Sequence, residues 1–280
     1  MNWWHAVILG IVEGVSEFLP ISSTGHLTVT EELLGYKVDD LGITAFTAVI
    51  QSGAILAAIV YFWRDIVRLA VGFFRGLASA EARKTADFRL GLGVIVGVIP
   101  AVIVGLAFKH VIEGALRSLW VVAGALILWS LVMWLADRRS AVVPDPRGEQ
   151  SMTVKDSLII GLWQCIAVIP GVSRSGATIS GGLFLGIDRV TATRWSFFLG
   201  IPTLLGAGIL EATTASKHIS ATVGWGATGI GMAVSFVVAY ASIAWLLRFV
   251  QTNKFTAFII YRVVAGLAIM ALLLAGRVHG

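Results

Sequence analysis

The sequence predicts an all-α integral membrane protein with six transmembrane helices and two re-entrant helical hairpins, arranged as an inverted-topology repeat. Three observations lead to this fold class. Of the 280 residues, 57% are hydrophobic and only 13% are charged, whereas a soluble domain is about 25% charged. The apolar residues form runs long enough for membrane-spanning helices, unlike the short alternating segments of a β-barrel. Two of the apolar regions are interrupted in the middle by proline and small polar residues.

Six apolar segments are long enough to cross the bilayer as helices, which takes about 20 residues each. These segments are 43–63, 90–108, 119–135, 194–212, 225–247 and 257–275. Two further regions, 5–35 and 157–187, are apolar but broken at Pro20 and Pro170. Because irregular backbone is tolerated at membrane depth only inside protein or beside a water-filled cavity, we expect both regions to be re-entrant hairpins.

The two broken regions resemble each other. The stretch Gly10-Ile-Val-Glu-Gly before Pro20 corresponds, with one gap, to Gly161-Leu-Trp-Gln-Cys before Pro170. Each region is followed by three predicted spans. A unit with an odd number of crossings places its second copy upside down, and its site is expected at the midplane where the broken helices meet.

The domain organisation follows from this repeat. We expect a single membrane domain over 1–280, with repeat one at 1–136 and the inverted repeat two at 157–280. Each repeat consists of its hairpin and three spans. The longest polar stretch, from Asp137 to Asp156, contains two prolines and is predicted to be the linker between the repeats.

Basic residues are distributed unequally between the two sides of this layout. If the 64–89 loop is cytoplasmic, fourteen Lys and Arg lie on its side and five on the other, as the positive-inside rule requires. The first hairpin then enters from the outside, the second from the cytoplasm, and both termini are external. The net charge of +5 reflects this topology, so we expect no nucleic-acid partner, and contact of the 64–89 loop with anionic lipid is a secondary expectation. The two basic residues not included in this count, Arg174 and Arg262, lie at membrane depth.

Two carboxylates lie in the apolar part of the first hairpin. Glu13 and Glu17 are four residues apart, so both point to the same side of a helix. A charged residue at the bilayer centre costs about 2.5–3.5 kcal/mol on insertion scales, and such residues usually face a polar cavity and serve a function there. Ser23 and His26 follow closely and are three apart, close enough for the histidine to activate or orient the hydroxyl.

The polar residues after each break fit the binding of phosphate. A helix that restarts there presents free N–H groups and the positive end of its dipole, and arginine adds a bidentate fork. The candidate phosphate-binding residues are Ser22, Thr24, Ser173, Arg174, Ser175 and Thr178. Gln51, within a predicted span, is a further candidate. Because carboxylates repel phosphate, Glu13 and Glu17 imply either a bridging divalent cation or proton transfer.

The segments that carry these residues resemble a known family. Glu13-Gly-Val-Ser-Glu-Phe-Leu-Pro-Ile-Ser-Ser-Thr-Gly-His26 and Pro170-Gly-Val-Ser-Arg-Ser-Gly-Ala-Thr178 are similar to the two signatures of the bacterial undecaprenyl-diphosphate phosphatases, the bacitracin-resistance family. The segments 46–53, 185–189 and 196–202 also resemble family segments, so the similarity covers most of the chain.

This resemblance implies the hydrolysis of a polyprenyl diphosphate to the monophosphate and inorganic phosphate, which recycles the lipid carrier for cell-wall synthesis. It also implies a multi-pass protein of the bacterial cytoplasmic (inner) membrane, a site open to the external side, and a divalent cation, Mg²⁺ or Ca²⁺. Carried over to this sequence, Glu13 and Glu17 would hold the metal or handle protons, and Arg174 would clamp charge. Ser23 would be the candidate nucleophile and His26 its base or orienter. The resemblance does not decide whether Ser23 or a water molecule attacks the phosphorus.

Alternatives remain at two levels. The five hydroxyl candidates after the breaks also fit ordinary helix capping and backbone bonding. For the whole chain, the alternative is a transporter or flippase of polyprenyl phosphate or another anion, because inverted repeats with broken helices are typical of secondary transporters. The sequence leaves the oligomeric state open. The phosphatase hypothesis requires Glu17 and Arg174 to share one solvent-reached chamber.

Overall fold

The prediction of an all-α fold is confirmed. The computed structural model describes residues 1–37, 40–108 and 118–278, without the side chains of 209–218 and 220–222. Within these ranges every regular element is a helix, and the only β-type pairing is an isolated bridge between Arg147 and Ile187.

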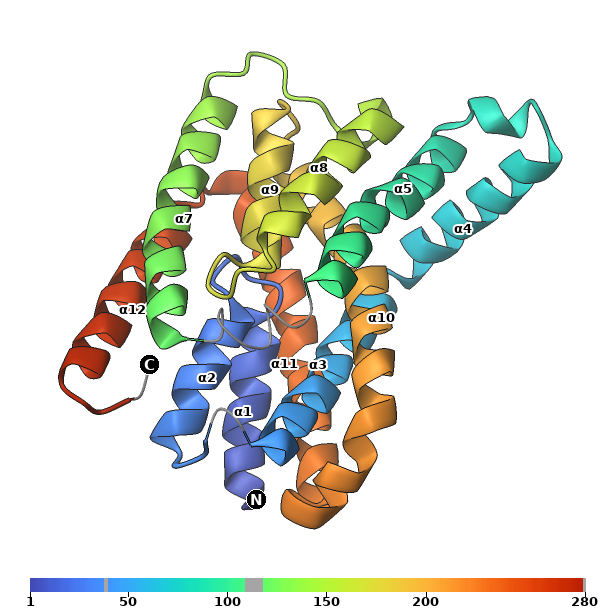
Figure 1. Ribbon diagram of the computed structural model, residues 1–280. Helices are drawn as coiled ribbons and strands as arrows, with labels where there is room; N and C mark the ends of the chain where they lie inside the picture. The colour runs from blue at the N-terminus through green and yellow to red at the C-terminus, as the bar shows by residue number, and fades with distance from the viewer. Residues whose placement is uncertain (38–39, 109–117, 279–280) are drawn as a thin grey trace.

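Figure 1 shows the order of the helices along the described parts of the chain. The first half contains α1 (Trp3–Ser16), α2 (Ser23–Leu33), α3 (Leu41–Tyr61), α4 (Trp63–Ala78), the 3₁₀ helix η1 (Ala82–Lys84), α5 (Ala86–Ala107) and α7 (Leu119–Ala141). The second half contains the 3₁₀ helix η3 (Glu149–Ser151), α8 (Val154–Ile166), α9 (Arg174–Phe184), α10 (Arg189–Thr222), α11 (Trp225–Thr252) and α12 (Thr256–Leu274).

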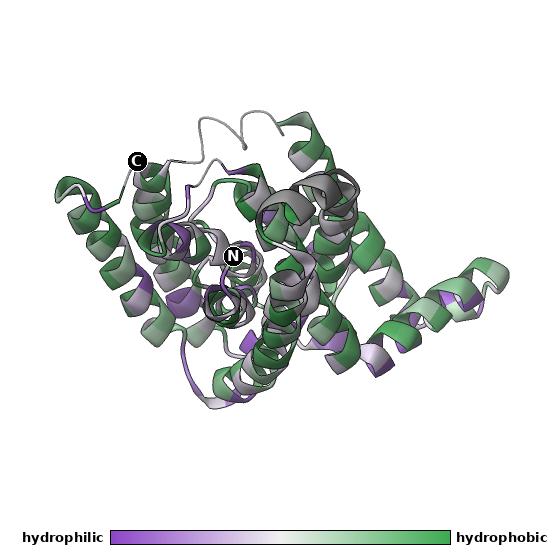
Figure 2. Ribbon diagram, turned by 90° about the horizontal axis from the view of Figure 1, so that it is seen from below, coloured by the Kyte–Doolittle hydropathy of each residue, from purple (hydrophilic) through white to green (hydrophobic). Residues whose placement is uncertain are grey.

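The long helices identify an integral membrane protein. Within the described residues, five of them, α3, α5, α7, α11 and α12, are long and apolar enough to cross a bilayer. Figure 2 shows that the outer helices consist mostly of hydrophobic residues, and the exposed ones among them include Leu106, Leu128 and Val237. Such a surface is the one that lipid covers. The sixth predicted span, 194–212, lies within α10.

Both predicted hairpins are helix–break–helix units. α1 and α2 are separated by 17–22, and α8 and α9 by 167–173. The two units enter from opposite ends of the molecule, and their breaks meet near its centre (Figure 1). In each break, one serine before the second helix adopts a left-handed backbone: φ is 76° at Ser22 and 75° at Ser173. This matched conformation agrees with an internal repeat; the inverted topology itself stays a prediction.

Small residues hold the hairpins against the spans. A Cβ added at Gly10 would lie 2.6 Å from the carbonyl oxygen of Gly231, and one at Gly161 would lie 2.0 Å from that of Gly97. Gly171, with φ of +97°, passes so close to α7 that a Cβ would lie 2.4 Å from the Val122 carbonyl oxygen. Such close backbone approach is typical of helix packing in membranes. Here it sets the position of the two breaks relative to the spans.

Two expectations about connecting segments were wrong. The 64–89 region is not a loop, because α4, η1 and the start of α5 occupy most of it. Its polar and apolar residues alternate with helical period, so the high average polarity concealed an amphipathic helix. The expected linker from Asp137 to Asp156 is also shorter, since α7 continues to Ala141 and α8 begins at Val154; a helix need not end where its apolar part ends.

Candidate active site

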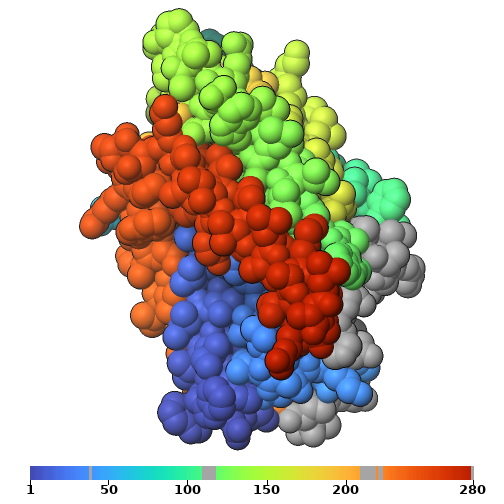
Figure 3. Space-filling view, turned by 90° about the vertical axis from the view of Figure 1, so that its left-hand side faces the viewer, coloured from blue at the N-terminus to red at the C-terminus, as the bar shows by residue number. Residues whose placement is uncertain are grey.

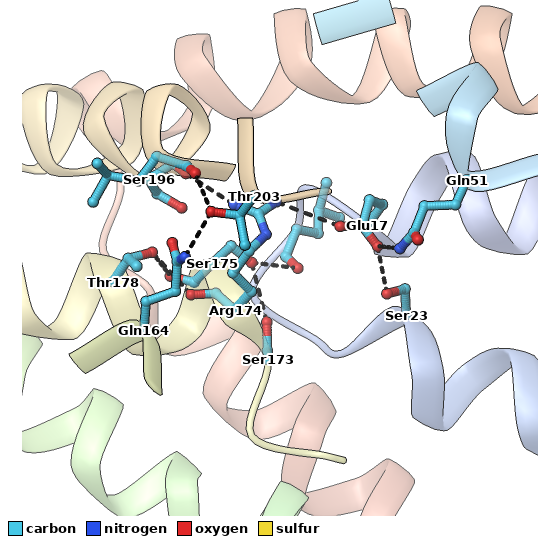
Figure 4. A network of polar contacts seen from close by, with 12 residues as sticks. Glu17, Ser23, Gln51, Gln164, Ser173, Arg174, Ser175, Thr178, Ser196 and Thr203 are labelled. Atoms are coloured by element: carbon cyan, nitrogen blue, oxygen red, sulfur yellow. Dashed lines mark hydrogen bonds and ion pairs between the residues drawn. The ribbon is translucent and has the colours of Figure 1, made fainter. Parts of the chain in front are cut away.

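A polar cavity lies where the two breaks meet. Its volume is about 370 Å³, and residues of both breaks and of α3, α5, α8 and α10 line it. The lining residues with functional side chains are Glu17, Ser22, Ser23, Thr24, Gln51, Gln164, Ser173, Arg174 and Thr203. Figure 4 shows most of them around the Glu17–Arg174 pair. Residues from both halves of the sequence therefore form one chamber.

Glu17 is the centre of the polar contacts in this cavity. One carboxylate oxygen, Oε2, accepts hydrogen bonds from the Ser23 hydroxyl at 2.6 Å and from Gln51 Nε2 at 3.3 Å. The other, Oε1, lies 3.4 Å from Nη2 of Arg174. The acid of the first hairpin and the guanidinium of the second thus share one chamber, as the phosphatase hypothesis requires.

Arg174 is the first residue of α9 and is held by its surroundings. Its Nη1 donates to the carbonyl oxygen of Ser196 at 2.8 Å, and its guanidinium lies 5.9 Å from the centre of the Phe18 ring. A Cβ at position 200 would lie 1.9 Å from Nη1, so Gly200 leaves the space that the arginine occupies. Nε has no hydrogen-bond partner within the described residues. The side chain is therefore fixed in place with donor capacity left for a ligand.

Two helix N-termini face the cavity. α2 begins at Ser23 and α9 at Arg174, and the residues on either side of each start line the chamber. The first N–H groups of a helix have no partner within it, and they carry the positive end of the helix dipole. Together with Arg174, these two ends make the chamber suitable for an anion with several oxygens, such as a diphosphate.

The remaining hydroxyls of the second hairpin have mainly structural contacts. Ser173 lines the cavity and caps α9 by accepting from the Gly176 N–H at 3.2 Å. Ser175 donates to the Leu19 carbonyl oxygen at 3.0 Å, which joins the two breaks. Thr178 donates to the carbonyl oxygen of Arg174 at 2.8 Å. Neither Ser175 nor Thr178 lines the cavity, so direct phosphate contact, expected of both from sequence, is not the arrangement observed.

Glu13 lies one helical turn before Glu17 and does not line the cavity. It is fully buried, and neither carboxylate oxygen has a hydrogen-bond partner within the described residues. An ionised carboxylate in this state is strongly disfavoured unless a cation or a proton neutralises it. The environment of Glu13 therefore fits both roles expected from sequence, metal binding and proton handling.

The residues suit a divalent cation only in combination with a substrate. Across the described residues there is no group of three or more His, Cys, Asp or Glu side chains able to hold a metal ion. Mg²⁺ typically takes one or two carboxylates and completes its shell with water and substrate phosphates. Glu13 and Glu17 supply that number of carboxylates, so the donor set fits a metal that binds together with the diphosphate.

His26 has partners other than the one expected. Its Nδ1 donates to the Ser22 carbonyl oxygen at 2.8 Å, and its Nε2 lies 2.7 Å from the Tyr261 hydroxyl. The two rings also stack, with 5.5 Å between their centres. The Ser23 hydroxyl instead donates to Glu17. The expected Ser23–His26 pair is therefore absent from this arrangement, and His26 supports the left-handed turn at Ser22.

Two polar residues of the cavity were not identified from sequence. Gln164 donates from Nε2 to the Thr203 hydroxyl at 3.0 Å, and its Oε1 is buried without a partner within the described part of the chain. Gln164 occupies the position in the second hairpin that Glu13 occupies in the first, so the internal repeat could have identified it. Thr203 lies in the middle of α10, and no local pattern distinguishes it.

Arg262 connects the two breaks from outside the cavity. This α12 residue is fully buried. Its Nη1 donates to the Pro20 carbonyl oxygen at 3.1 Å and its Nη2 to the Gly171 carbonyl oxygen at 2.8 Å. Figure 3 shows α12 crossing the face of the molecule beside α7 and the first hairpin. The sequence marked Arg262 as a charge at membrane depth, but only the structure identifies its partners.

The chain is similar to known proteins over nearly its full length. A model of the family described as "Bacitracin resistance protein BacA" matches residues 6–268. A protein named undecaprenyl-diphosphatase from Cutibacterium acnes is 56% identical, with 99% of each chain covered. Undecaprenyl-diphosphatase 3 from Frankia casuarinae is 52% identical, again over 99% of each chain, and undecaprenyl-diphosphatase from Corynebacterium striatum is 46% identical over 98% of this chain and 95% of its own.

These matches extend over both hairpins and all the long helices that surround the cavity. About half of the residues are identical over nearly the full length of the chain, whereas two proteins can share a fold with far fewer identical residues. The chain therefore belongs to the bacitracin resistance protein BacA family.

Proposed function

We propose that this protein is a membrane diphosphatase that hydrolyses undecaprenyl diphosphate to undecaprenyl monophosphate and inorganic phosphate. The reaction returns the lipid carrier to cell-wall synthesis and confers resistance to bacitracin. The observation that carries the proposal is the Glu17–Arg174 pair at two converging helix N-termini, in a chain related over its full length to undecaprenyl-diphosphatases. A transporter is not favoured, since these relatives bear the names of enzymes.

Substrate binding is assigned to the basic side of the cavity. Arg174 and the first N–H groups of α2 and α9 bind the diphosphate oxygens, with Ser22, Thr24 and Ser173 beside them. The cavity of about 370 Å³ accommodates the polar headgroup, while the polyprenyl chain remains among the apolar surfaces of the spans. Binding of this kind places the terminal phosphorus next to the Ser23 hydroxyl and the Glu17 carboxylate.

The proposed chemistry begins at Ser23 or at a water molecule in its place. Glu17, which accepts a hydrogen bond from the Ser23 hydroxyl at 2.6 Å, acts as general base while the oxygen attacks the terminal phosphorus. The bond from that phosphorus to the bridging oxygen breaks, and the lipid monophosphate leaves. If Ser23 attacks, a water molecule then hydrolyses the phosphoserine; if water attacks, phosphate is released directly. Arg174 stabilises the developing negative charge in both routes.

A divalent cation, Mg²⁺ or Ca²⁺, is proposed to bind with the substrate. Its contribution would be to neutralise charge on the transferring phosphoryl group. Glu17 and Glu13 are the residues that would hold it: the Glu17 carboxylate lines the cavity, and the buried Glu13 carboxylate has no hydrogen-bond partner within the described residues. When no cation is bound, Glu13 holds a proton, because burial without a partner disfavours its ionised form.

We further propose that the protein lies in the bacterial cytoplasmic (inner) membrane with the cavity open to the external side. The support is the distribution of basic residues, fourteen on the side of 64–89 and five on the other. External cysteine-reactive reagents should then label a Thr24→Cys variant in intact cells, and labelling only after the membrane is opened would contradict the orientation.

Phosphate release by purified protein in detergent tests the activity. Glu17→Gln, Arg174→Ala and Ser23→Ala should each lower turnover by about a hundredfold or more if they remove a base, a charge clamp and a nucleophile. Ser180→Ala is the matched control, because within the described residues this buried α9 hydroxyl has one hydrogen bond, to the carbonyl oxygen of Gly176.

The outcomes separate the remaining alternatives. Full activity of Ser23→Ala with loss in Glu17→Gln would assign the attack to water. Full activity of both Glu17→Gln and Arg174→Ala would remove this cavity from consideration. Absence of phosphate release in detergent by a folded wild-type protein would favour the transporter hypothesis, since no gradient exists there.

A further inference from the structure

A second cavity lies far from the diphosphate site, on the helical hairpin formed by α4 and α5. This hairpin projects from the body of the molecule at the upper right of Figure 1. The cavity has a volume of about 500 Å³ and is lined by α4 and by residues of the turn into α5. None of its lining residues belongs to the active-site cavity, so the proposed hydrolysis gives it no role.

The cavity is cationic. Arg64, Arg68 and Arg75 line it. Arg68 and Arg75 follow Arg64 by four and eleven residues, so all three lie on one face of α4. The charge of Arg68 is satisfied by Asp65, Glu149 and Asp87. Asp87 is the one acidic residue in the lining.

The other two arginines are uncompensated. Within the described part of the chain, the guanidinium groups of Arg64 and Arg75 have neither a hydrogen bond nor an ion pair. Both side chains are exposed, and they flank the cavity on either side of Arg68. The cavity therefore has an excess of positive charge and suits an anionic ligand.

Apolar surface accompanies these charges on the same helix. Trp63 is 58% exposed and Phe74 is 67% exposed, each adjacent in sequence to an unpaired arginine. Val67 and Val71 line the cavity itself. A soluble anion gains nothing by contact with exposed apolar side chains, whereas a membrane lipid presents a charged headgroup and an apolar chain together.

The opposite face of α4 is apolar. A groove of about 320 Å³ runs between α4, α5 and α10 and is lined entirely by apolar residues and glycine, among them Phe73, Phe74 and Ile201. The cationic cavity and the apolar groove lie on opposite faces of α4, at the side of the molecule to which the basic residues assign the anionic leaflet.

We propose that the α4–α5 hairpin binds one anionic phospholipid, with the headgroup phosphate in the cavity beside Arg64 and Arg75 and an acyl chain along Val67 and Val71 on the same face of α4. The lipid fixes a hairpin that otherwise contacts the body of the protein mainly through α5 and through the Arg68–Glu149 and Arg194–Asp65 ion pairs.

Native mass spectrometry of the purified full-length protein, titrated with phosphatidylglycerol or phosphatidylcholine, tests this site. Wild-type protein should retain one phosphatidylglycerol in preference to phosphatidylcholine. Because a basic residue contributes about 1 kcal/mol to binding an anionic lipid surface, Arg64→Gln with Arg75→Gln should weaken retention by about thirtyfold. The pair Arg139→Gln and Arg248→Gln is the matched control, since both residues are exposed on the same predicted side and neither lines this cavity.

Several outcomes would overturn the proposal. Unchanged phosphatidylglycerol retention in the Arg64/Arg75 variant would exclude the cavity, and equal loss in the control pair would mean general surface charge. Displacement of the lipid by millimolar inorganic phosphate would indicate a site for the free anion. Tighter retention of polyprenyl phosphate than of phosphatidylglycerol, lost in the same variant, would indicate a second substrate site. Phosphate release should stay at the wild-type rate in all these variants, which separates this test from that of the active site.

Discussion

Replacing Arg262 by methionine is expected to abolish most of the activity while changing the stability of the fold much less. Arg262 donates to the carbonyl oxygens of Pro20 and Gly171 at 3.1 and 2.8 Å, one in each break. A hydrogen bond from a charged group contributes about 1.5–3 kcal/mol, so losing both destabilises the protein by about 3–6 kcal/mol.

An opposing effect of similar size acts on stability. The guanidinium is fully buried, and within the described residues it has no carboxylate partner. Burying a charge costs several kcal/mol, which the unbranched methionine side chain avoids. The two contributions to the free energy of unfolding therefore largely cancel.

No such cancellation applies to catalysis. Without the common donor, the breaks that carry Glu17 and Arg174 can separate, and a misplacement of about 1 Å can lower a rate by about a hundredfold. That factor corresponds to about 2.7 kcal/mol of transition-state stabilisation.

The assay measures kcat and KM for phosphate release together with the thermal unfolding of the same preparation. The kcat should fall more than the KM rises, because Arg262 does not line the cavity. Ser130→Ala is the control, since it removes the contact to Nε at 3.3 Å and a bond to the Leu126 carbonyl oxygen within α7 but neither bond to a break, and it should leave kcat nearly unchanged. A folded Arg262→Met protein with the wild-type kcat would refute the reasoning. Should that variant not fold, Arg262→Lys keeps the charge but lacks the planar fork, and full activity there would refute it equally.

Three further predictions follow from single contacts. Gly200→Ala should lower kcat by about tenfold or more, because its Cβ would lie 1.9 Å from Arg174 Nη1 and displaced catalytic groups lose rate steeply; a Gly200→Ala variant as active as wild type would contradict the proposed role of this close contact. EDTA should stop phosphate release and Mg²⁺ or Ca²⁺ should restore it, whereas undiminished release in EDTA would leave Glu13 and Glu17 with proton transfer alone. Burial would raise the pKa of Asp156, but hydrogen bonds from Arg147 and Thr153 outweigh it and hold that pKa below its ordinary value. Ionised Asp156 therefore stabilises the fold above about pH 4, and this contribution is lost as the pH falls through the lowered pKa. The unfolding temperature should consequently fall less on acidification in Asp156→Asn than in wild type, and equal falls would show that the carboxylate is not linked to stability.

The parts of the fold that depend on local composition could be predicted from sequence. Hydropathy identified the membrane helices, because burial of backbone in lipid demands long apolar helical runs. Pro20 and Pro170 marked the two breaks, since proline lacks an N–H and cannot continue a helix interior. Glu17 and Arg174 stood out because charges are disfavoured at membrane depth. The helix α4 was missed although the polar and apolar residues of 64–89 alternate with helical period. The basic residues were counted only by the side of the membrane, without asking on which face of a helix they lie.

The sequence by itself determined that this is a helical membrane protein with two broken hairpins and a candidate acid–arginine pair. Only the tertiary structure decided that Ser23 donates to Glu17 instead of pairing with His26, that Thr178 turns to backbone, and that Arg262 links both breaks. Hydropathy and proline act on the chain locally, within a few residues. A side chain's hydrogen-bond partner depends on which distant segments pack beside it, and Arg262 lies 242 and 91 residues from the two carbonyls it binds.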